Sequence, residues 1–307
     1  MGASTEIGEL YGNLAENLDQ DLLEDIGNDV YDNFVADKDS RSDWERTYTE
    51  GLDNLGLKIE ERNEPWAGAC GVYHPLLSEA VVRFQSQAIT EIFPAAGPVR
   101  TNIVGKVTED KEQQGKRVQD YMNYLLTEEM KEYRNETENM LFSLPLAGSA
   151  FKKIYYDVNM QRPCSMFIPA EDFVVSYGAS DLSTCERATH IMKRTSNEVR
   201  KLQVSGFYAD VDLGTASEDV DEIENKYQEL TGNSSTYDSD SRHTILEMQV
   251  ELDLVGFEDS QDGEETGIQL PYVVSIDLSS RKVLAIRRNY YEDDEKMMKR
   301  EHFVHYT

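Results

Sequence analysis

The spacing of apolar residues changes near position 150, and this change constrains the fold more than any other feature of the chain. From residue 4 to about residue 147, apolar side chains recur every three or four positions, which places them on one face of an α-helix. From Ala150 onwards they alternate with polar residues, as in a strand with one buried face. A helical first half followed by a strand-rich second half predicts the α+β class.

Amphipathic helices are expected throughout the first half, with one or two of them over residues 4–36. One more is expected to be capped by Ser40 or Ser42, to run through Trp44, Tyr48 and Leu52, and to stop at Gly56.

Besides this helix, three regions of the first half show helical spacing. The first, over residues 4–36, carries a ladder of apolar residues four positions apart, and the second covers residues 75–93 between two proline-containing breaks. The third runs from about residue 109 to 144, where Pro145 and Gly148 are expected to disrupt its end, and it follows a short strand-like piece over 101–107. The ladder consists of Leu10, Leu14, Leu18, Leu22, Ile26, Val30 and Phe34.

The second helix is interpreted as a packed scaffold element rather than the wall of an active site. Its apolar stripe includes Phe84, Ile89 and Phe93, and the opposite side of the helix is polar.

Strands are expected in two groups, separated by a helix that begins near SNEVRKLQ at residue 196. A further helix over 219–230 and a polar loop over 231–241 follow, and HFVHYT at 302–307 reads as a strand in mid-course, so we expect the natural chain to continue. The first group of strands covers 151–157, 165–168, 173–177 and 188–194, and the second forms an antiparallel meander of 245–255, 272–278 and 282–290.

The net charge of −29 limits the partners that the chain can bind. Phosphate backbones are bound by Lys and Arg, so a chain with 59 acidic and 30 basic residues is not expected to hold nucleic acid non-specifically. The three cysteines, Cys70, Cys164 and Cys185, form no CxxC pair and favour neither a disulfide framework nor a zinc site. No apolar run approaches the roughly 18 residues of a membrane span, and no secretory signal peptide begins the chain.

A search for catalytic motifs predicts no enzyme. The sequence lacks the Gly-rich phosphate-binding loops, the GxSxG nucleophile motif and the HExxH zinc motif. His302 and His305 would lie on opposite faces of a strand, and the acidic stretches 210–214 and 258–265 lack the ligand spacing of a calcium loop. No cofactor or metal is therefore expected.

The stretch RRNYYEDDEKMMKR, residues 287–300, interleaves basic residues with two tyrosines. It is either a contact for a partner or, because acidic residues 292–295 and Glu301 accompany it, a salt-bridged surface. The candidate contact residues in and before it are Arg281, Lys282, Arg287, Arg288, Tyr290 and Tyr291.

Four long segments resemble the portal proteins of short-tailed bacteriophages, the head-to-tail connectors of the podovirus type. These segments are EPWAGACGVYHPLLSEAVVRFQSQAITEIFPAAGPVRT at 64–101, FIPAEDFVVSYGASDLSTCERATHIMKRTSNEVRKLQVSGFY at 167–208, HTILEMQVELDLVGFED at 243–259 and LPYVVSIDLSSRKVLAIRRNY at 270–290.

The resemblance implies a structural subunit of a ring of about twelve copies at one capsid vertex of the virion, assembled in the host cytoplasm. Such a ring forms the channel for packaging and ejection of double-stranded DNA, and it contacts the capsid protein, the terminase motor and a tail adaptor. It also implies an α+β wing over 1–195, a stem-like helical segment over 196–242, a β-rich clip module over 243–307, and a chain that is truncated at its C-terminus.

An alternative is an acidic, non-enzymatic binding module, either a DNA mimic or another virion scaffold. It would display its carboxylates on one outer face and would not form a large ring.

Overall fold

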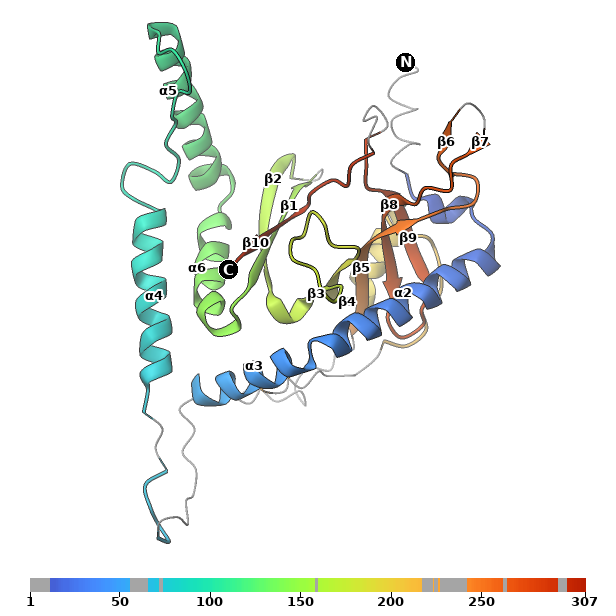
Figure 1. The fold of residues 1–307 in the computed structure, drawn as a ribbon, viewed down its shortest axis with the longest axis horizontal. Coiled ribbons are helices and arrows are strands. Elements are labelled where there is room, and N and C mark those ends of the chain that lie inside the picture. Colours follow the sequence, from blue (N-terminus) through green and yellow to red (C-terminus); the bar gives the residue numbers. More distant parts are fainter. Residues whose placement is uncertain are drawn as a thin grey trace. The chain divides into compact units, whose positions relative to one another are not determined.

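The computed structural model describes residues 12–55, 66–71, 74–157, 160–216, 242–261, 264–291 and 297–307, together with Ile223 and Lys226. The fold is α+β, as predicted, with antiparallel sheets (Figure 1). The chain divides into two compact units. Unit 1 comprises Met1–Thr49 and Glu171–Glu301, and unit 2 comprises Glu50–Ala170 and His302–Thr307.

Unit 1 is built on a five-stranded antiparallel sheet with the order β3-β4-β5-β8-β9. The predicted meander is confirmed, because β5 pairs with β8 and β8 pairs with β9. β4 pairs with β5 along its whole length, from Ala188 opposite Gln249 to Thr195 opposite Arg242. The strands are β3 (Phe173–Val175), β4 (Ala188–Thr195), β5 (Arg242–Leu252), β8 (Leu270–Asp277) and β9 (Val283–Arg288).

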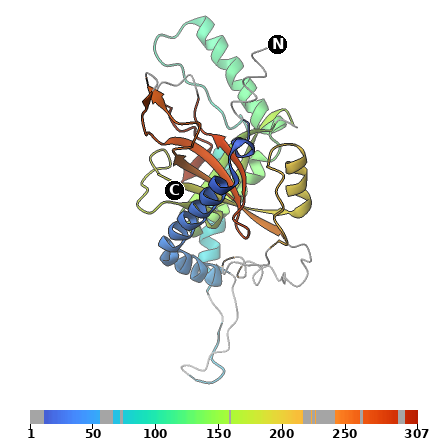
Figure 2. The ribbon, with the colours of Figure 1, turned by 90° about the vertical axis from the view of Figure 1, so that its right-hand side faces the viewer.

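Helices cover both faces of this sheet. Helix α2 (Gln20–Ser40) packs on the face that carries Leu246 and Met248, through the apolar ladder that the sequence predicted. Helix α7 (Ser196–Val204) packs through Val199 on the opposite face, where the alternate residue Ile245 points. Figure 2 shows α2 crossing in front of the strands and α7 to one side of them.

Three further elements belong wholly or partly to unit 1. The turn η1 (Leu14–Asn17) lies against β9, and α3 (Ser42–Leu55) follows α2 directly and crosses the boundary between the two units. A small hairpin joins β6 (Ser260–Gln261) to β7 (Glu264–Glu265).

Unit 2 combines a three-stranded sheet with a group of helices. The sheet has the order β10-β1-β2, with β1 (Ala150–Asp157), β2 (Arg162–Pro169) and β10 (Phe303–Tyr306). Helix α6 (Tyr133–Ala147) packs on β1 and β2 and lies beside α4 (Leu76–Ile92) (Figure 1). The strand predicted at 302–307 is thus confirmed, and it pairs with β1, about 150 residues earlier in the chain.

The expected long helix over 109–144 is wrong in two respects. It is divided into α5 (Glu109–Tyr124), a π-helical turn (Leu125–Glu129) and α6, with the break at the buried Met130. Pro145 lies inside α6, which continues to Ala147 and ends at Gly148 with φ +75°. A proline removes one backbone hydrogen bond from a helix, whereas a glycine in the left-handed conformation, such as Gly148, is a common helix terminator.

The expected strand over 101–107 is also wrong, because side chains of α5 replace a partner strand. Asn123 accepts from the backbone N–H of Val99 at 2.8 Å and donates to the Val99 carbonyl oxygen at 3.1 Å. Gln119 accepts from the N–H of Thr101 at 3.3 Å. At Val99 and Thr101 the chain therefore bonds to side chains of a helix, and residues 101–107 form no strand of the described sheets.

The two units differ from the three segments expected from the sequence. The expected boundaries at residues 195 and 242 both lie inside unit 1, and the segment 1–195 is shared between the units. The helix expected over 219–230 and the loop expected over 231–241 lie outside the described residues apart from Ile223 and Lys226.

Candidate functional site

The candidate contact residues Arg281 and Lys282 lie on the turn between β8 and β9. The Arg281 guanidinium lies 3.9 Å from the ring centre of Tyr31 and donates to the side-chain oxygen of Asn28 at 3.3 Å. Lys282 Nζ donates to the backbone carbonyl of Asp212 at 2.5 Å. Both residues are exposed, although the charged group of each also makes a contact within unit 1.

Arg287 and Arg288 are more deeply engaged. The Arg287 guanidinium lies 4.1 Å from the ring centre of Phe207 and donates to the Phe207 carbonyl oxygen, and burial lowers the pKa of Arg287. The Arg288 guanidinium lies 5.5 Å from the ring centre of Phe257. These two arginines pack against aromatic side chains of their own unit.

The two candidate tyrosines have different environments. Tyr290 is buried and meets Tyr272 edge-on, with ring centres 6.2 Å apart. Tyr291 is half exposed beneath the guanidinium of Arg300, at 4.5 Å from the ring centre. Of the six candidate contact residues, the structure therefore leaves Arg281, Lys282 and Tyr291 exposed at the surface of unit 1.

The three scaffold residues of the second predicted helix are only partly packed. Ile89 contacts the cluster formed by α6 and β1, and Phe93 meets Tyr133 edge-on with ring centres 5.9 Å apart. Phe84 points outwards with 41% of its surface exposed, and Val81 is the buried residue of α4.

Exposed apolar side chains recur along α4 and α5 of unit 2. They continue through the connecting segment, in which Val104 is 92% exposed. Large apolar groups in such positions are typical of surfaces that contact another protein. The group comprises Leu76, Val82, Phe84 and Ile92 on α4, Val104 and Val107 in the connection, and Val118, Tyr121 and Tyr124 on α5.

The charge of the chain is divided unevenly between the units. Unit 2 contains 13 Lys/Arg and 17 Asp/Glu, a net charge of −4, and unit 1 contains 17 Lys/Arg and 42 Asp/Glu, a net charge of −25. The nearly neutral unit is the one whose helices expose apolar side chains. Association through unit 2 would therefore meet much less electrostatic repulsion than association through unit 1.

Two ionisable groups with shifted pKa values, the buried Lys152 and the partly buried Glu171, were not singled out from the sequence. Lys152 of β1 is 2% exposed and donates from Nζ to the Thr137 hydroxyl at 2.6 Å, and burial lowers the pKa of this lysine to about 8. Burial also raises the pKa of Glu171 to about 7, while its backbone carbonyl accepts from Arg41 at 2.7 Å. In the sequence, Lys152 follows directly after Ala150 and Phe151, and all three residues are buried at the start of β1. This position is the only feature of the sequence that points to the burial of Lys152.

Metal-binding groupings of three or more His, Cys, Asp or Glu side chains do not occur within the part of the chain that the structure describes. His305 stacks on Phe151 with ring centres 4.7 Å apart, and its Nε2 lies 3.2 Å from the Ser149 hydroxyl. The three cysteines are free thiols, of which Cys164 and Cys185 are buried. None of the helices in the described ranges has the length and apolar character needed to cross a membrane.

Comparison with known proteins does not identify a family for this chain. No protein-family model matches the chain, and a search of curated proteins finds no significant match.

Proposed function

We propose that this chain is a non-enzymatic structural subunit of a ring of about twelve copies, of the kind that forms the portal at one capsid vertex of a tailed bacteriophage. The observation that carries the proposal is the resemblance of residues 64–101, 167–208, 243–259 and 270–290 to portal proteins of short-tailed phages. The ring would provide the channel for packaging and ejection of DNA.

The distribution of apolar surface supports the proposal. A subunit of a closed ring meets two neighbours, so it must carry apolar surface that stays exposed in the isolated chain. The exposed residues of α4 and α5, such as Phe84 and Tyr121, have this character. They belong to the unit with the smaller net charge, in which a second copy is repelled least.

The acidic character of unit 1 agrees with a channel for DNA. A negatively charged wall repels phosphates, so the duplex passes without the salt-dependent adhesion that Lys and Arg produce. Arg281, Lys282 and Tyr291 remain the candidate contacts for the terminase motor or the tail adaptor, because their side chains are exposed.

The same charge distribution favours a second candidate, an acidic binding module that mimics DNA or serves as another virion scaffold. A net charge of −25 on unit 1 would attract a basic DNA-binding surface. Such a module would act as a monomer or small oligomer.

The mass of the natural, full-length assembly distinguishes these candidates. Native mass spectrometry should give a mass of about twelve subunits, and negative-stain microscopy should show rings with a central hole. A monomer or dimer at all salt and protein concentrations, together with displacement of DNA from a basic protein, would favour the acidic module instead.

A further inference from the structure

Glu171 places a carboxyl group at the point where the chain returns from unit 2 to unit 1. It belongs to the 3₁₀ turn η3 (Ala170–Asp172), and Ala170 is the residue of unit 2 directly before it. The residue is partly buried, but its Oε2 atom is fully buried and has no hydrogen-bond partner among the described residues. A buried carboxylate oxygen without a partner costs free energy, so the charged form of this group opposes the packing around it.

The segment that joins α2 to α3, residues 41–48, packs on this carboxyl and is called the α2–α3 corner here. Arg41, between the two helices, donates to the backbone carbonyl oxygens of Glu171 at 2.7 Å and Phe173 at 3.1 Å. The Tyr48 hydroxyl bonds to the Glu171 carboxylate, and the Tyr48 side chain is buried. Trp44 stacks on Tyr48 with ring centres 5.1 Å apart. The corner is therefore attached to η3 through a guanidinium and a phenol.

The charges around the carboxyl do not compensate for its burial. The guanidinium of Arg41 also bonds to Glu45 at 2.9 Å, and Asp172 in the same turn repels a second negative charge. On α2, the buried Asp37 is matched by Arg187 at 2.9 Å. Burial is the largest effect and raises the pKa of the carboxyl to about 7, although its own backbone N–H, Arg41 and the Tyr48 hydroxyl favour the charged form.

We propose that Glu171 is a pH-sensitive switch that controls the attachment of the α2–α3 corner to η3. The neutral carboxyl keeps the corner in place, and its ionisation favours release of the corner, because water then solvates the charge. Helix α3 carries the chain from unit 1 into unit 2 after Thr49, so the switch acts on one of the segments that join the units. This property goes beyond the proposed ring and does not rest on it.

The direction of the pH effect follows from the two forms of the site. In the attached form the pKa of the carboxyl is about 7, whereas in the released form the group meets water and regains its ordinary pKa of 4.5. Between these pH values release of the corner also releases a proton, so the released fraction rises with pH. The ratio of released to attached molecules should increase about 10-fold between pH 6 and pH 8 and should level off at higher pH.

Limited digestion of the full chain with trypsin tests the proposal. Trypsin can cleave after Arg41 only when the guanidinium has left the two carbonyl oxygens of Glu171 and Phe173, so the rate follows the released fraction. The wild type is compared at each pH with Glu171→Gln, whose side chain is neutral and has the same shape, and the pH dependence of trypsin itself then cancels. The ratio of the two rates, wild type to variant, should rise about 10-fold between pH 6 and pH 8. Mass spectrometry quantifies the peptide that ends at Arg41.

Three controls separate the switch from other pH effects. Glu50→Gln, an exposed change on α3, should leave the wild-type rates unchanged at both pH values. Cleavage after Arg288 of β9 should show no such rise, because it requires unfolding of the sheet. Tyr48→Phe removes a bond that favours the charged carboxylate and should move the rise to higher pH. A constant ratio, an equal rise at Arg288, or an unchanged pH dependence in Tyr48→Phe would overturn the proposal.

Discussion

Asn13 closes the edge of the five-stranded sheet with its side chain. Its Nδ2 donates to the Leu284 carbonyl at 2.9 Å, and its Oδ1 accepts from the N–H of Ile286 at 3.0 Å. These two bonds occupy the positions that a neighbouring strand would take at the edge strand β9. A single amide therefore joins the N-terminal part of unit 1 to a strand about 270 residues later.

Replacing Asn13 by Ala should destabilise unit 1 by about 1–3 kcal/mol, because the N–H of the buried Ile286 would lose its acceptor. Urea unfolding measures the loss, and hydrogen exchange at the Ile286 amide should become faster. Asn17→Ala, an exposed change in the same turn, is the control. Similar stability of the two variants would contradict this role for Asn13.

Lys152 is a second residue to consider, because its burial lowers its pKa and so makes the stability of the fold depend on pH. Its Nζ lies 4.4 Å from the ring centre of Tyr133 and 6.0 Å from that of Tyr306, and Glu136 is the nearby acid that favours its charge. Burial outweighs this attraction and lowers the pKa from 10.5 to about 8. Between these two pH values the unfolded chain holds a proton that the folded chain has released, so this lysine makes the folded state more stable as pH rises from 8 towards 10.5.

Lys152→Met should remove the rise in stability between pH 8 and pH 10.5. It should also stabilise the protein at pH 7 by about 1–2 kcal/mol, because each unit by which the pKa is lowered costs the folded state about 1.4 kcal/mol. The loss of the contact with the Tyr133 ring offsets part of this gain. The Thr137 hydroxyl still donates to the Tyr133 carbonyl at 2.7 Å. Denaturant unfolding between pH 7 and 9.5 measures the difference between the variant and the wild type. Lys153→Met, in the next position of β1, should retain the pH dependence. Parallel pH profiles for Lys152→Met and the wild type would refute the argument.

Helix α2 packs closely against the turn between β8 and β9 at Gly27. A Cβ atom at Gly27 would lie 2.2 Å from the carbonyl oxygen of Arg281, far inside the contact distance. The turn is fixed by Asp277, and Arg281 itself has a left-handed backbone with φ +56°. Neither the helix nor the turn can move without loss of other contacts, so the approach of the two elements requires Gly27.

Gly27→Ala should therefore destabilise unit 1 by about 2 kcal/mol or more, by forcing α2 away from the sheet. Gly115→Ala on α5 is a matched control, because its added Cβ would meet the Thr101 hydroxyl oxygen at an ordinary 3.5 Å. That change should stabilise its helix by about 0.5–1 kcal/mol. Thermal unfolding of both variants measures the two effects, and a neutral Gly27→Ala would show that α2 is not held at this distance.

The whole molecule combines an acidic unit with a nearly neutral one whose helices expose apolar side chains. If the chain assembles through unit 2, that surface should carry the association energy, and the charge of unit 1 should oppose it. These two contributions can be tested separately.

A double substitution, Phe84→Ser with Tyr121→Ser, should weaken assembly at least about 10-fold, because large apolar and aromatic groups dominate protein–protein contacts. Both residues are exposed, so the fold of the subunit should be retained. Mass photometry across a dilution series measures the assembled fraction, with Lys116→Ser on α5 as the control. Unchanged assembly would exclude these two residues from the contact.

Salt should favour assembly. Because each chain has a net charge of −29, screening lowers the repulsion between copies, and we expect a larger assembled fraction at 300 mM than at 20 mM sodium chloride. Light scattering at fixed protein concentration measures this change. Dissociation at the higher salt would show instead that ion pairs hold the copies together.

Hydrophobic periodicity by itself determined the class of the fold and most of its elements. The ladder from Leu14 to Phe34 does face the core, and the meander and the last strand are present, because alternation and helical spacing reflect burial of one face. Local spacing does not reveal backbone groups that bond to distant side chains, as the N–H of Thr101 does to Gln119, and the strand expected over 101–107 was wrong.

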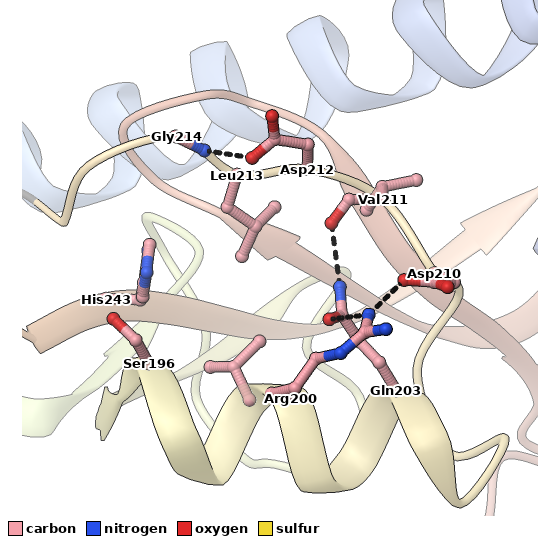
Figure 3. Close-up of a pocket in the computed structure, with 10 residues that line it drawn as sticks. Ser196, Arg200, Gln203, Asp210, Val211, Asp212, Leu213, Gly214 and His243 are labelled. Carbon is pink, nitrogen blue, oxygen red and sulfur yellow. Dashed lines mark hydrogen bonds and ion pairs between the residues drawn. The ribbon is translucent and has the colours of Figure 1, made fainter.

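Only the tertiary structure decided which segments belong together. The pairing of β10 with β1, the division of the chain into discontinuous units and the burial of Lys152 all depend on contacts between residues far apart in the sequence. The same is true of a pocket that residues of α7 and His243 of β5 line together (Figure 3), since the pairing of β4 with β5 brings these two elements to one place. Such contacts are selected by packing of the complete core, which no local pattern of residues contains.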